Sequence, residues 1–191
     1  MKNINLNLKE NQEKILPLVW TGGSEEINVN AALVGRGSRL TILGALFLAN
    51  SDQVKLNINI YHVGEDTFSD TLIKSVLTDQ AVGNFYGLVK IKKGAKNTNT
   101  YFREDALLLS KQAKAEAIPS LEIDENEVKA GHASTVGPVD SEQLFYLTSK
   151  GIGQIESKRL IVQGYFHSVL GLLPAKEQET LNTFLSKKFK I

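Results

Sequence analysis

The chain has 191 residues, with 22 lysine and arginine residues against 21 aspartate and glutamate residues, and it contains no cysteine. A formal charge of +1 gives no field that would gather nucleic-acid phosphates or anionic lipid, so neither is expected as a partner. The absence of cysteine excludes disulfides, thiolate nucleophiles and all-cysteine metal sites. The first residues lack a signal-peptide core and no run reaches membrane-spanning length, which predicts a cytoplasmic protein.

From residue 4 to about residue 123, apolar side chains occupy every other position, which indicates short β-strands with one buried face. The run from Leu40 to Leu48 is apolar on both faces, as expected for a strand covered on two sides. Gly, Asn, Asp and Ser turn signals separate the strands. Such strands could form a sandwich, a jelly roll or a solenoid. Recurring exposed Asn and Thr favour a solenoid, although no clean repeat period is present.

After Gly137 the pattern becomes helical. Asp140 is a predicted N-cap with Gln143 as its capping-box partner. Helices are predicted over 140–151, over 154–172 and from 174 onward. In the second helix an apolar stripe is predicted at Ile155, Leu160, Ile161, Phe166, Val169 and Leu170. The chain is therefore divided into a β part of residues 1–138 and a C-terminal helical domain of residues 139–191.

Familiar enzyme motifs are missing. Gly35 and Gly37 are not followed by the third glycine of a dinucleotide-binding fingerprint, and there is no GxxxxGK[ST] phosphate loop. Neither GxSxG nor HExxH occurs, so a serine or zinc hydrolase of a familiar kind is not supported. A self-contained phosphate site, and with it a directly bound nucleotide, is therefore not expected.

Three histidines and one acidic pair are the candidates for chemistry. His132 lies where strands give way to helices, a usual place for functional groups, and imidazole suits metal binding or proton transfer. His62 is in phase with an apolar row and is predicted to be a hydrogen-bonded core residue, whereas His167 is expected at a surface or interface. Glu104 and Asp105 are predicted in a solvated turn. A carbohydrate-active acidic pair is disfavoured because adjacent side chains diverge.

An ordered set of residues between about 84 and 166 resembles a known family. The set comprises Phe85, Gly87-Leu88-Val89, Lys93-Gly94-Ala95, Thr98, Tyr101, Leu107-Leu108-Leu109-Ser110, Pro119, Leu121-Glu122-Ile123, Val128-Lys129, His132, Thr135-Val136-Gly137, Leu144-Phe145-Tyr146-Leu147 and Ser149-Lys150-Gly151-Ile152. It is similar to the C-terminal part of the SufB/SufD family, the scaffold proteins of the SUF iron-sulfur cluster assembly system.

The resemblance implies a mainly β fold, a right-handed parallel β-helix (β-solenoid) followed by a small C-terminal α-helical domain. It implies a non-catalytic subunit that pairs through the end of its β-helix with a SufB-like or identical subunit. A SufC-like ABC ATPase would dock on the helical domain, and an iron-sulfur cluster would be held transiently at the pair. The implied docking or packing residues are Leu144, Phe145, Tyr146, Ile152 and Phe166.

His132 matches the histidine that SufD-type members place at the pair interface, where it is thought to serve as a cluster ligand. Glu104 falls approximately on the cysteine of SufB-type members, and a shift of one residue would place Asp105 there, so both are candidate secondary ligands. Because that cysteine is absent, the chain looks SufD-like. Imidazole and carboxylate are poorer cluster ligands than thiolate, so a partner would have to supply sulfur.

The chain departs from the family pattern in four ways. Ala133 replaces a glycine, Lys150 replaces an arginine and Phe102 stands where glutamine is common. A long N-terminal region typical of members is also missing. The chain is therefore either a minimal member or a reduced relative with altered partners. The alternative hypothesis is a self-pairing β-helix interaction module without a cluster role.

Overall fold

Ten β-strands and three α-helices follow one another over residues 1–189, which the computed structural model describes. The strands are β1 (Lys2–Leu8), β2 (Glu13–Trp20), β3 (Glu25–Leu33), β4 (Arg39–Leu48), β5 (Gln53–His62), β6 (Phe68–Leu77), β7 (Val82–Ile91), β8 (Asn99–Leu108), β9 (Lys114–Ile123) and β10 (Lys129–Pro138). The helices are α1 (Ser141–Ser149), α2 (Gln154–Leu170) and α3 (Ala175–Lys188). Residues 190 and 191, the end of the predicted helical domain, lie outside the described residues.

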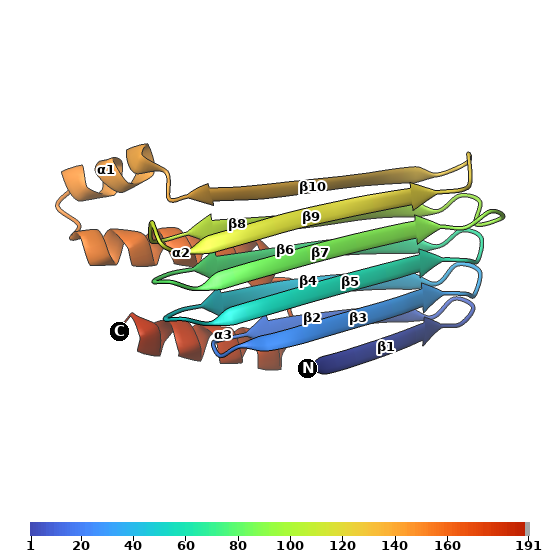
Figure 1. The fold of residues 1–191 in the computed structure, drawn as a ribbon, viewed down its shortest axis with the longest axis horizontal. Helices are drawn as coiled ribbons and strands as arrows, with labels where there is room; N and C mark the ends of the chain where they lie inside the picture. The colour runs from blue at the N-terminus through green and yellow to red at the C-terminus, as the bar shows by residue number, and fades with distance from the viewer. Residues whose placement is uncertain (190–191) are drawn as a thin grey trace.

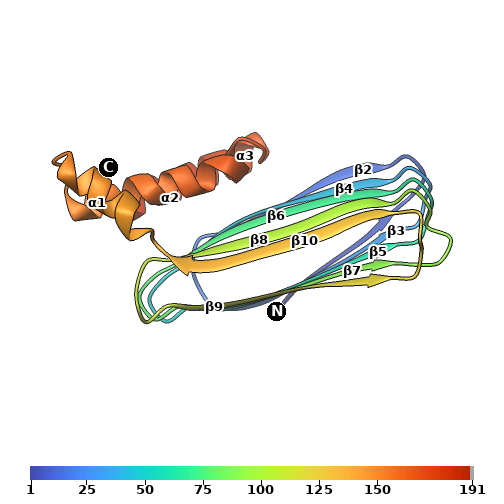
Figure 2. The same ribbon diagram turned by 90° about the horizontal axis from the view of Figure 1, so that it is seen from above.

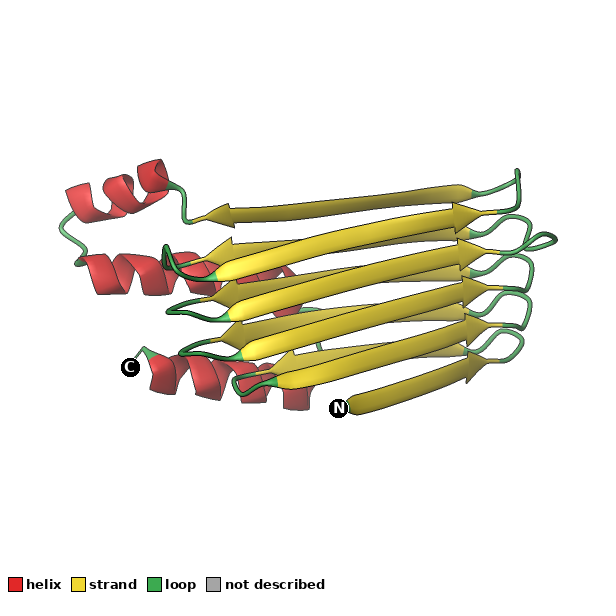
Figure 3. Ribbon diagram, viewed as in Figure 1, coloured by secondary structure: helices red, strands yellow, loops and turns green. Residues whose placement is uncertain are grey.

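The strands form two parallel sheets, the odd sheet in the order β1-β3-β5-β7-β9 and the even sheet in the order β10-β8-β6-β4-β2. In Figure 1 the odd-numbered strands run to the right in front, the even-numbered strands return behind them, and each coil lies above the one before. The winding is therefore right-handed. Figure 2 shows the two sheets facing each other across the lumen, and Figure 3 shows the change to helices after β10. The predicted β-helix with C-terminal helices is confirmed.

The coils have similar shapes but different lengths, which explains the missing repeat period in the sequence. Lys2 pairs with Ile27, an offset of 25 residues. Val82 pairs with Gln53 on one side and with Lys114 on the other, offsets of 29 and 32 residues. From β4 onward every strand has 10 residues, so the variation lies in the turns.

The lumen is filled by the inward-facing side chains of both sheets. Buried positions alternate with more exposed ones along β3 and β5, because successive side chains of a strand point to opposite faces. Phe85 and Phe102 are the largest side chains of this core. Gly87 of β7 is needed where the Phe102 ring crosses the lumen, since a Cβ there would lie 2.3 Å from the ring Cζ.

The outer face of the even sheet is covered by α2 and α3 (Figure 2), which explains why β4 is buried on both faces, as predicted. Phe47 of β4 lies at the centre of this second apolar cluster, with its ring centroid 5.2 Å from that of Phe184 on α3. The helices contribute Val162, Phe166, Val169, Leu173, Leu181 and Leu185. The predicted stripe of the second helix was wrong at Ile155, which is 79% exposed, and it missed the buried Val162.

Two asparagine ladders run across the outer face of the odd sheet. Nδ2 of Asn28 donates to Oδ1 of Asn3 at 3.2 Å, and Nδ2 of Asn57 donates to Oδ1 of Asn28 at 2.6 Å. The second ladder joins Asn5, Asn30 and Asn59 in the same way. The recurring asparagines of the sequence therefore stack coil on coil, as expected for a solenoid.

Two prolines occupy the outer edges of the two-sheet stack. The amide of Arg39 donates to the carbonyl of Gln12, so the even-numbered residues of β2 bond to β4 and Pro17 faces the open edge. The amide of Lys114 donates to the carbonyl of Ala81, which directs Pro119 of β9 to the open edge in the same way. Neither proline removes a hydrogen bond from its sheet, as is usual for proline on edge strands.

The three helices begin and end where the sequence predicts, within two residues. The side chain of Asp140 caps α1 by accepting from the amide of Glu142 at 2.8 Å. Gly151 follows α1 with a φ of 83°, and Pro174 is the N-cap of α3. Within residues 1–189, no helix is both long enough and apolar enough to span a membrane.

Candidate functional site

His132 lies on β10, the last strand of the even sheet, and its side chain is exposed. It is in register with Phe102 of β8, whose side chain fills the lumen, so the imidazole points to the same inner face. The coil that would cover this position does not follow, because the chain turns into α1 after Pro138. Figure 1 shows β10 as the last strand of the stack, so the predicted ligand His132 lies at the open C-terminal end of the lumen.

The backbone N–H and C=O groups of His132 also point away from the stack of coils, toward the open edge of the even sheet. The amide of Lys129 donates to the carbonyl of Thr98, so the odd-numbered residues of β10 bond to β8. The even-numbered residues, including His132 and Ser134, direct their N–H and C=O groups to the open edge. One residue thus presents both an imidazole and an unpaired peptide edge at the end of the solenoid.

Glu104 lies on β8 beneath this end, one strand back and in register with Ser134. From strand spacing and rise, its Cα is about 8 Å from that of His132. The side chain is only 1% exposed, and among the described residues its Oε1 has no hydrogen-bond partner. Burial, and then the charge of Asp105, raises the pKa of Glu104 to about 8, so the carboxyl group is mostly protonated at neutral pH.

Asp105 points the opposite way, to the outer face of the even sheet. Its Oδ2 accepts from Lys74 Nζ at 2.7 Å and from Arg103 Nε at 3.0 Å. Lys74 in turn lies 4.5 Å from the ring centroid of Tyr165 on α2. The prediction of a solvated turn was wrong for both acidic residues, because β8 is an internal strand with α2 behind it. Asp105 anchors a helix and faces away from the lumen.

His62 is a satisfied core histidine, as predicted. Its Nδ1 lies 2.8 Å from Thr67 Oγ1 and its Nε2 lies 2.9 Å from Ser69 Oγ. The Thr67 hydroxyl also donates to the carbonyl of Gly64 at 3.3 Å and lies 2.9 Å from Thr98 Oγ1, so the imidazole belongs to a buried network of hydroxyl groups. Burial lowers the pKa of His62 to about 4, so the ring is neutral.

The remaining predicted residues lie on the C-terminal helices. Phe145 and Tyr146 of α1 are 73% and 60% exposed, while Leu144 and Ile152 are half-buried. Phe166 is fully buried against the even sheet, so it packs within the chain. His167 is exposed on α2, which agrees with its predicted surface position. The structure therefore leaves Phe145 and Tyr146 as the large unpaired apolar side chains of the predicted set.

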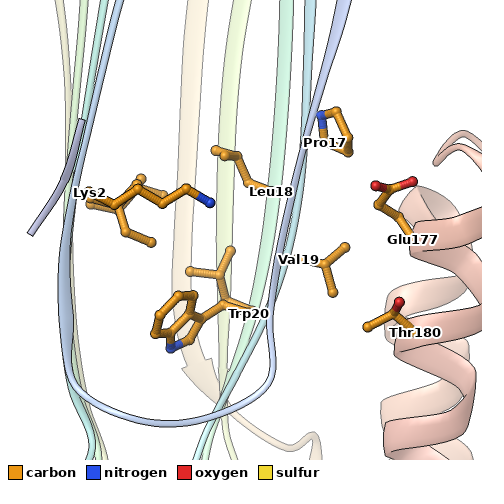
Figure 4. A pocket seen from close by; sticks show the side chains of 10 residues that line it. Lys2, Pro17, Leu18, Val19, Trp20, Glu177 and Thr180 are labelled. Atoms are coloured by element: carbon orange, nitrogen blue, oxygen red, sulfur yellow. The ribbon is translucent and has the colours of Figure 1, made fainter. Parts of the chain in front are cut away.

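A cavity of about 230 Å³ lies at the opposite end of the solenoid, between β1, β2 and α3. In Figure 4 the amine of Lys2 reaches from β1 across the lumen mouth toward Leu18, with Trp20 nearby. Glu177 and Thr180 of α3 complete its outer side (Figure 4). This cavity is remote from His132, and sequence reasoning did not identify it.

Within residues 1–189, no group of three or more His, Cys, Asp or Glu side chains is placed to hold a metal ion. His132 and Glu104 provide one imidazole and one carboxyl group, and the chain has no thiolate. Iron-sulfur clusters are normally held by several thiolates. Within residues 1–189, these two side chains alone do not form a site for a metal ion or a cluster.

The fold defines a parallel β-helix protein with an exposed histidine on the open edge of its last strand. Residues 13–165 match the family model described as the SufBD core domain of the SUF system for FeS cluster assembly. The chain belongs to the SufBD family, which confirms the resemblance seen in the sequence.

Individual relatives support the same assignment. The iron-sulfur cluster assembly protein SufD of Bacillus subtilis (strain 168) is 38% identical over 132 residues, covering 69% of this chain and 30% of the relative. An iron-sulfur cluster assembly SufBD family protein of Mycobacterium leprae (strain TN) is 34% identical over 160 residues, covering 78% and 41%. One from Mycobacterium tuberculosis (H37Rv) is 30% identical over 180 residues, covering 88% and 45%. The chain spans less than half the length of these relatives.

Proposed function

We propose that this chain is a SufD-like, non-catalytic scaffold subunit for iron-sulfur cluster assembly. It would present His132 to a cluster held transiently between two scaffold subunits and would bind no nucleotide itself. The observation that carries the proposal is the place of His132, an exposed imidazole on the open edge of the last strand in a SufBD-family chain. An interior position would have excluded a ligand shared with a second subunit.

The second subunit would be SufB-like or an identical copy. It would pair through the end of the solenoid, where β10 offers unpaired peptide groups. Glu104 supports the site as a candidate secondary ligand because its carboxyl group faces the same lumen. Asp105 is no longer proposed as a ligand, since its carboxylate is bound by Lys74 on the other side of the strand. Thiolates for a stable cluster would come from the partner.

A SufC-like ABC ATPase would dock on the C-terminal helices, through the exposed Phe145 and Tyr146 with Leu144 and Ile152 beside them. Adjacent exposed aromatic side chains are typical of interaction sites. The resemblance implies either docking or packing for Phe166, and we propose packing, because this side chain is buried against the even sheet. The division into a β-helix of residues 1–138 and a helical domain of residues 139–191 stays a prediction.

Two experiments test the proposal. Co-purification with an ABC ATPase should be lost in the Phe145→Ser, Tyr146→Ser double variant and kept in Ile155→Ser, an equally exposed apolar control on α2. Cluster formation with the ATPase and a cysteine-bearing scaffold partner should fall in His132→Ala and stay normal in His167→Ala, which removes another exposed histidine. Normal cluster formation by His132→Ala would falsify the ligand role.

The second candidate function is a self-pairing interaction module without a cluster role. The lack of thiolates in the chain and the open edge of β10 favour it. Molecular mass and iron content after anaerobic reconstitution with the partner separate the two functions. A stable homodimer that never retains iron would support the module.

A further inference from the structure

We propose that the cavity at the β2 end of the solenoid binds a free α-amino acid with a large apolar side chain. This cavity lies at the opposite end from His132, and its role does not depend on the proposed function. It combines an apolar pocket with a cationic side chain from β1 and an anionic side chain from α3. These are the three features that such a ligand needs.

The lumen side of the cavity is apolar and fixed in shape. Its walls and floor are formed by the side chains of Leu18, Trp20, Ile27, Leu46 and Leu56. Nε1 of Trp20 donates to the carbonyl of Gly23 at 3.1 Å, which holds the indole ring at the mouth of the lumen. The volume of about 230 Å³ exceeds the roughly 150 Å³ of an engineered apolar cavity that takes up benzene. A phenyl or branched aliphatic side chain therefore fits the cavity.

Two hydrogen-bond donors suit the carboxylate of the ligand. Lys2 extends its amine from β1 across the lumen mouth (Figure 4). The odd-numbered residues of β2 direct their peptide groups to the open edge, so the N–H of Val19 is the second donor. Hydrogen bonds from an ammonium group and from an amide are those that a carboxylate accepts most strongly. The lumen side of β2 therefore suits the acidic group of an amino acid.

Oxygen acceptors on the other side of β2 suit the ammonium group. The carbonyl of Pro17 also points to the open edge, and the proline nitrogen beside it carries no hydrogen. Glu177 of α3 faces β2 from outside, with Thr180 one turn further along the helix (Figure 4). A carbonyl, a carboxylate and a hydroxyl group all accept hydrogen bonds from an ammonium group. The edge of β2 thus separates a place for a carboxylate from a place for an amine.

This arrangement favours a free amino acid over other occupants. A simple carboxylate leaves Glu177 without a partner, and a simple amine leaves Lys2 without one. A strand of another protein is disfavoured, because Pro17 offers it no donor in the middle of β2. Lys2 is exposed and Glu177 is partly exposed, so a modest dissociation constant, on the order of 1 mM, is expected.

The test is a titration of the full chain with L-phenylalanine, followed by calorimetry and by the fluorescence of Trp20, the single tryptophan of the sequence. Saturable binding of one molecule per chain is expected. Three analogues each remove one part of the ligand: 3-phenylpropionate lacks the ammonium group, phenethylamine lacks the carboxylate, and glycine lacks the side chain. The first two should bind roughly 5- to 10-fold more weakly, and glycine should not bind measurably.

Variants of the chain assign the two charges. Lys2→Met should weaken binding of L-phenylalanine roughly 5- to 10-fold and leave binding of phenethylamine unchanged. Glu177→Gln should weaken binding of L-phenylalanine to a similar extent and leave binding of 3-phenylpropionate unchanged. Lys176→Met and Glu179→Gln remove exposed charges of α3 outside the cavity, so both should bind as the parent chain does.

Three results would overturn the inference: no saturable binding of L-phenylalanine, equally tight binding of either charged analogue, or unchanged binding by Lys2→Met or Glu177→Gln. The titration involves neither an ATPase nor a cluster. Normal cluster formation by His132→Ala would therefore reject the proposed function and leave the amino-acid site standing.

Discussion

Protonation of His62 in the lumen should reduce the contribution of this one residue to the stability of the β-helix at acid pH. Folding lowers the pKa of His62 from 6.5 to about 4 because the ring is buried. Between these values the unfolded chain binds a proton that the folded chain does not, so stability falls as the pH falls from 6.5 toward 4. The full effect is about 3 kcal/mol, of which about 2.5 kcal/mol is lost by pH 4.5.

Glu104 acts in the opposite direction, so the effect of His62 must be isolated. The pKa of Glu104 is raised to about 8, and its neutral form stabilises the fold increasingly as the pH falls from 8 toward 4.5. The measurement is therefore a double difference. Urea unfolding is followed by circular dichroism and Trp20 fluorescence at pH 7.5 and 4.5, for the parent chain and for His62→Gln. The glutamine amide can both donate and accept but does not titrate.

The parent chain should lose about 2.5 kcal/mol more than His62→Gln between the two pH values. If the unfolding transitions followed by circular dichroism and by Trp20 fluorescence coincide, unfolding is two-state. A double difference within about 0.5 kcal/mol of zero would refute the assignment of a neutral, buried His62, since the acid response of every other group cancels.

Further predictions concern the lumen and the α2 anchor. Gly87→Ala should lower the unfolding free energy by about 1–3 kcal/mol because its Cβ meets the Phe102 ring, and a second change, Phe102→Leu, should restore part of the loss. Lys74→Met leaves the buried Asp105 with only the half-exposed Arg103 as a partner, so the free energy of unfolding, measured by chemical denaturation, should fall by about 3 kcal/mol. Lys74→Arg should retain most of the stability of the parent chain. In Glu104→Gln the stability should fall on acidification from pH 8 to 4.5, because the contribution of Glu104 is removed and that of His62 remains; a pH dependence equal to that of the parent chain would show that the carboxyl group is already ionised in the fold.

The strands and helices could be predicted because their physical signals are local, whereas the right-handed parallel β-helix was implied by the family resemblance. Alternating apolar positions fixed the buried face of each strand, and Asp140, Gly151 and Pro174 marked the helix boundaries through capping and backbone geometry. The apolar residues on both faces of 40–48 also predicted that another part of the chain covers the outer face of this strand, β4. The repeat period stayed hidden because turns of different length separate equivalent positions.

The candidate site was less predictable, because burial of a polar residue depends on long-range contacts. Glu104 and Asp105 were assigned to a turn, since two adjacent acidic residues rarely lie in an internal strand. The burial of Asp105 is explained by its ion pair with Lys74 of the previous coil, which in turn lies against the Tyr165 ring of α2. The prediction that Ile155 is buried was wrong for a related reason, because the packing of α2 on the even sheet determines which residues of the helix are covered, and Ile155 in its first turn is not.

The positions of Pro17 and Pro119 have a consequence for assembly beyond the pair. If solenoids stacked head to tail, β10 of one molecule would meet β2 of the next and β9 would meet β1, so a proline would interrupt both seams of every junction. The two prolines thus oppose head-to-tail stacking of copies, and with it the open-ended fibre that a stack of parallel coils would otherwise nucleate.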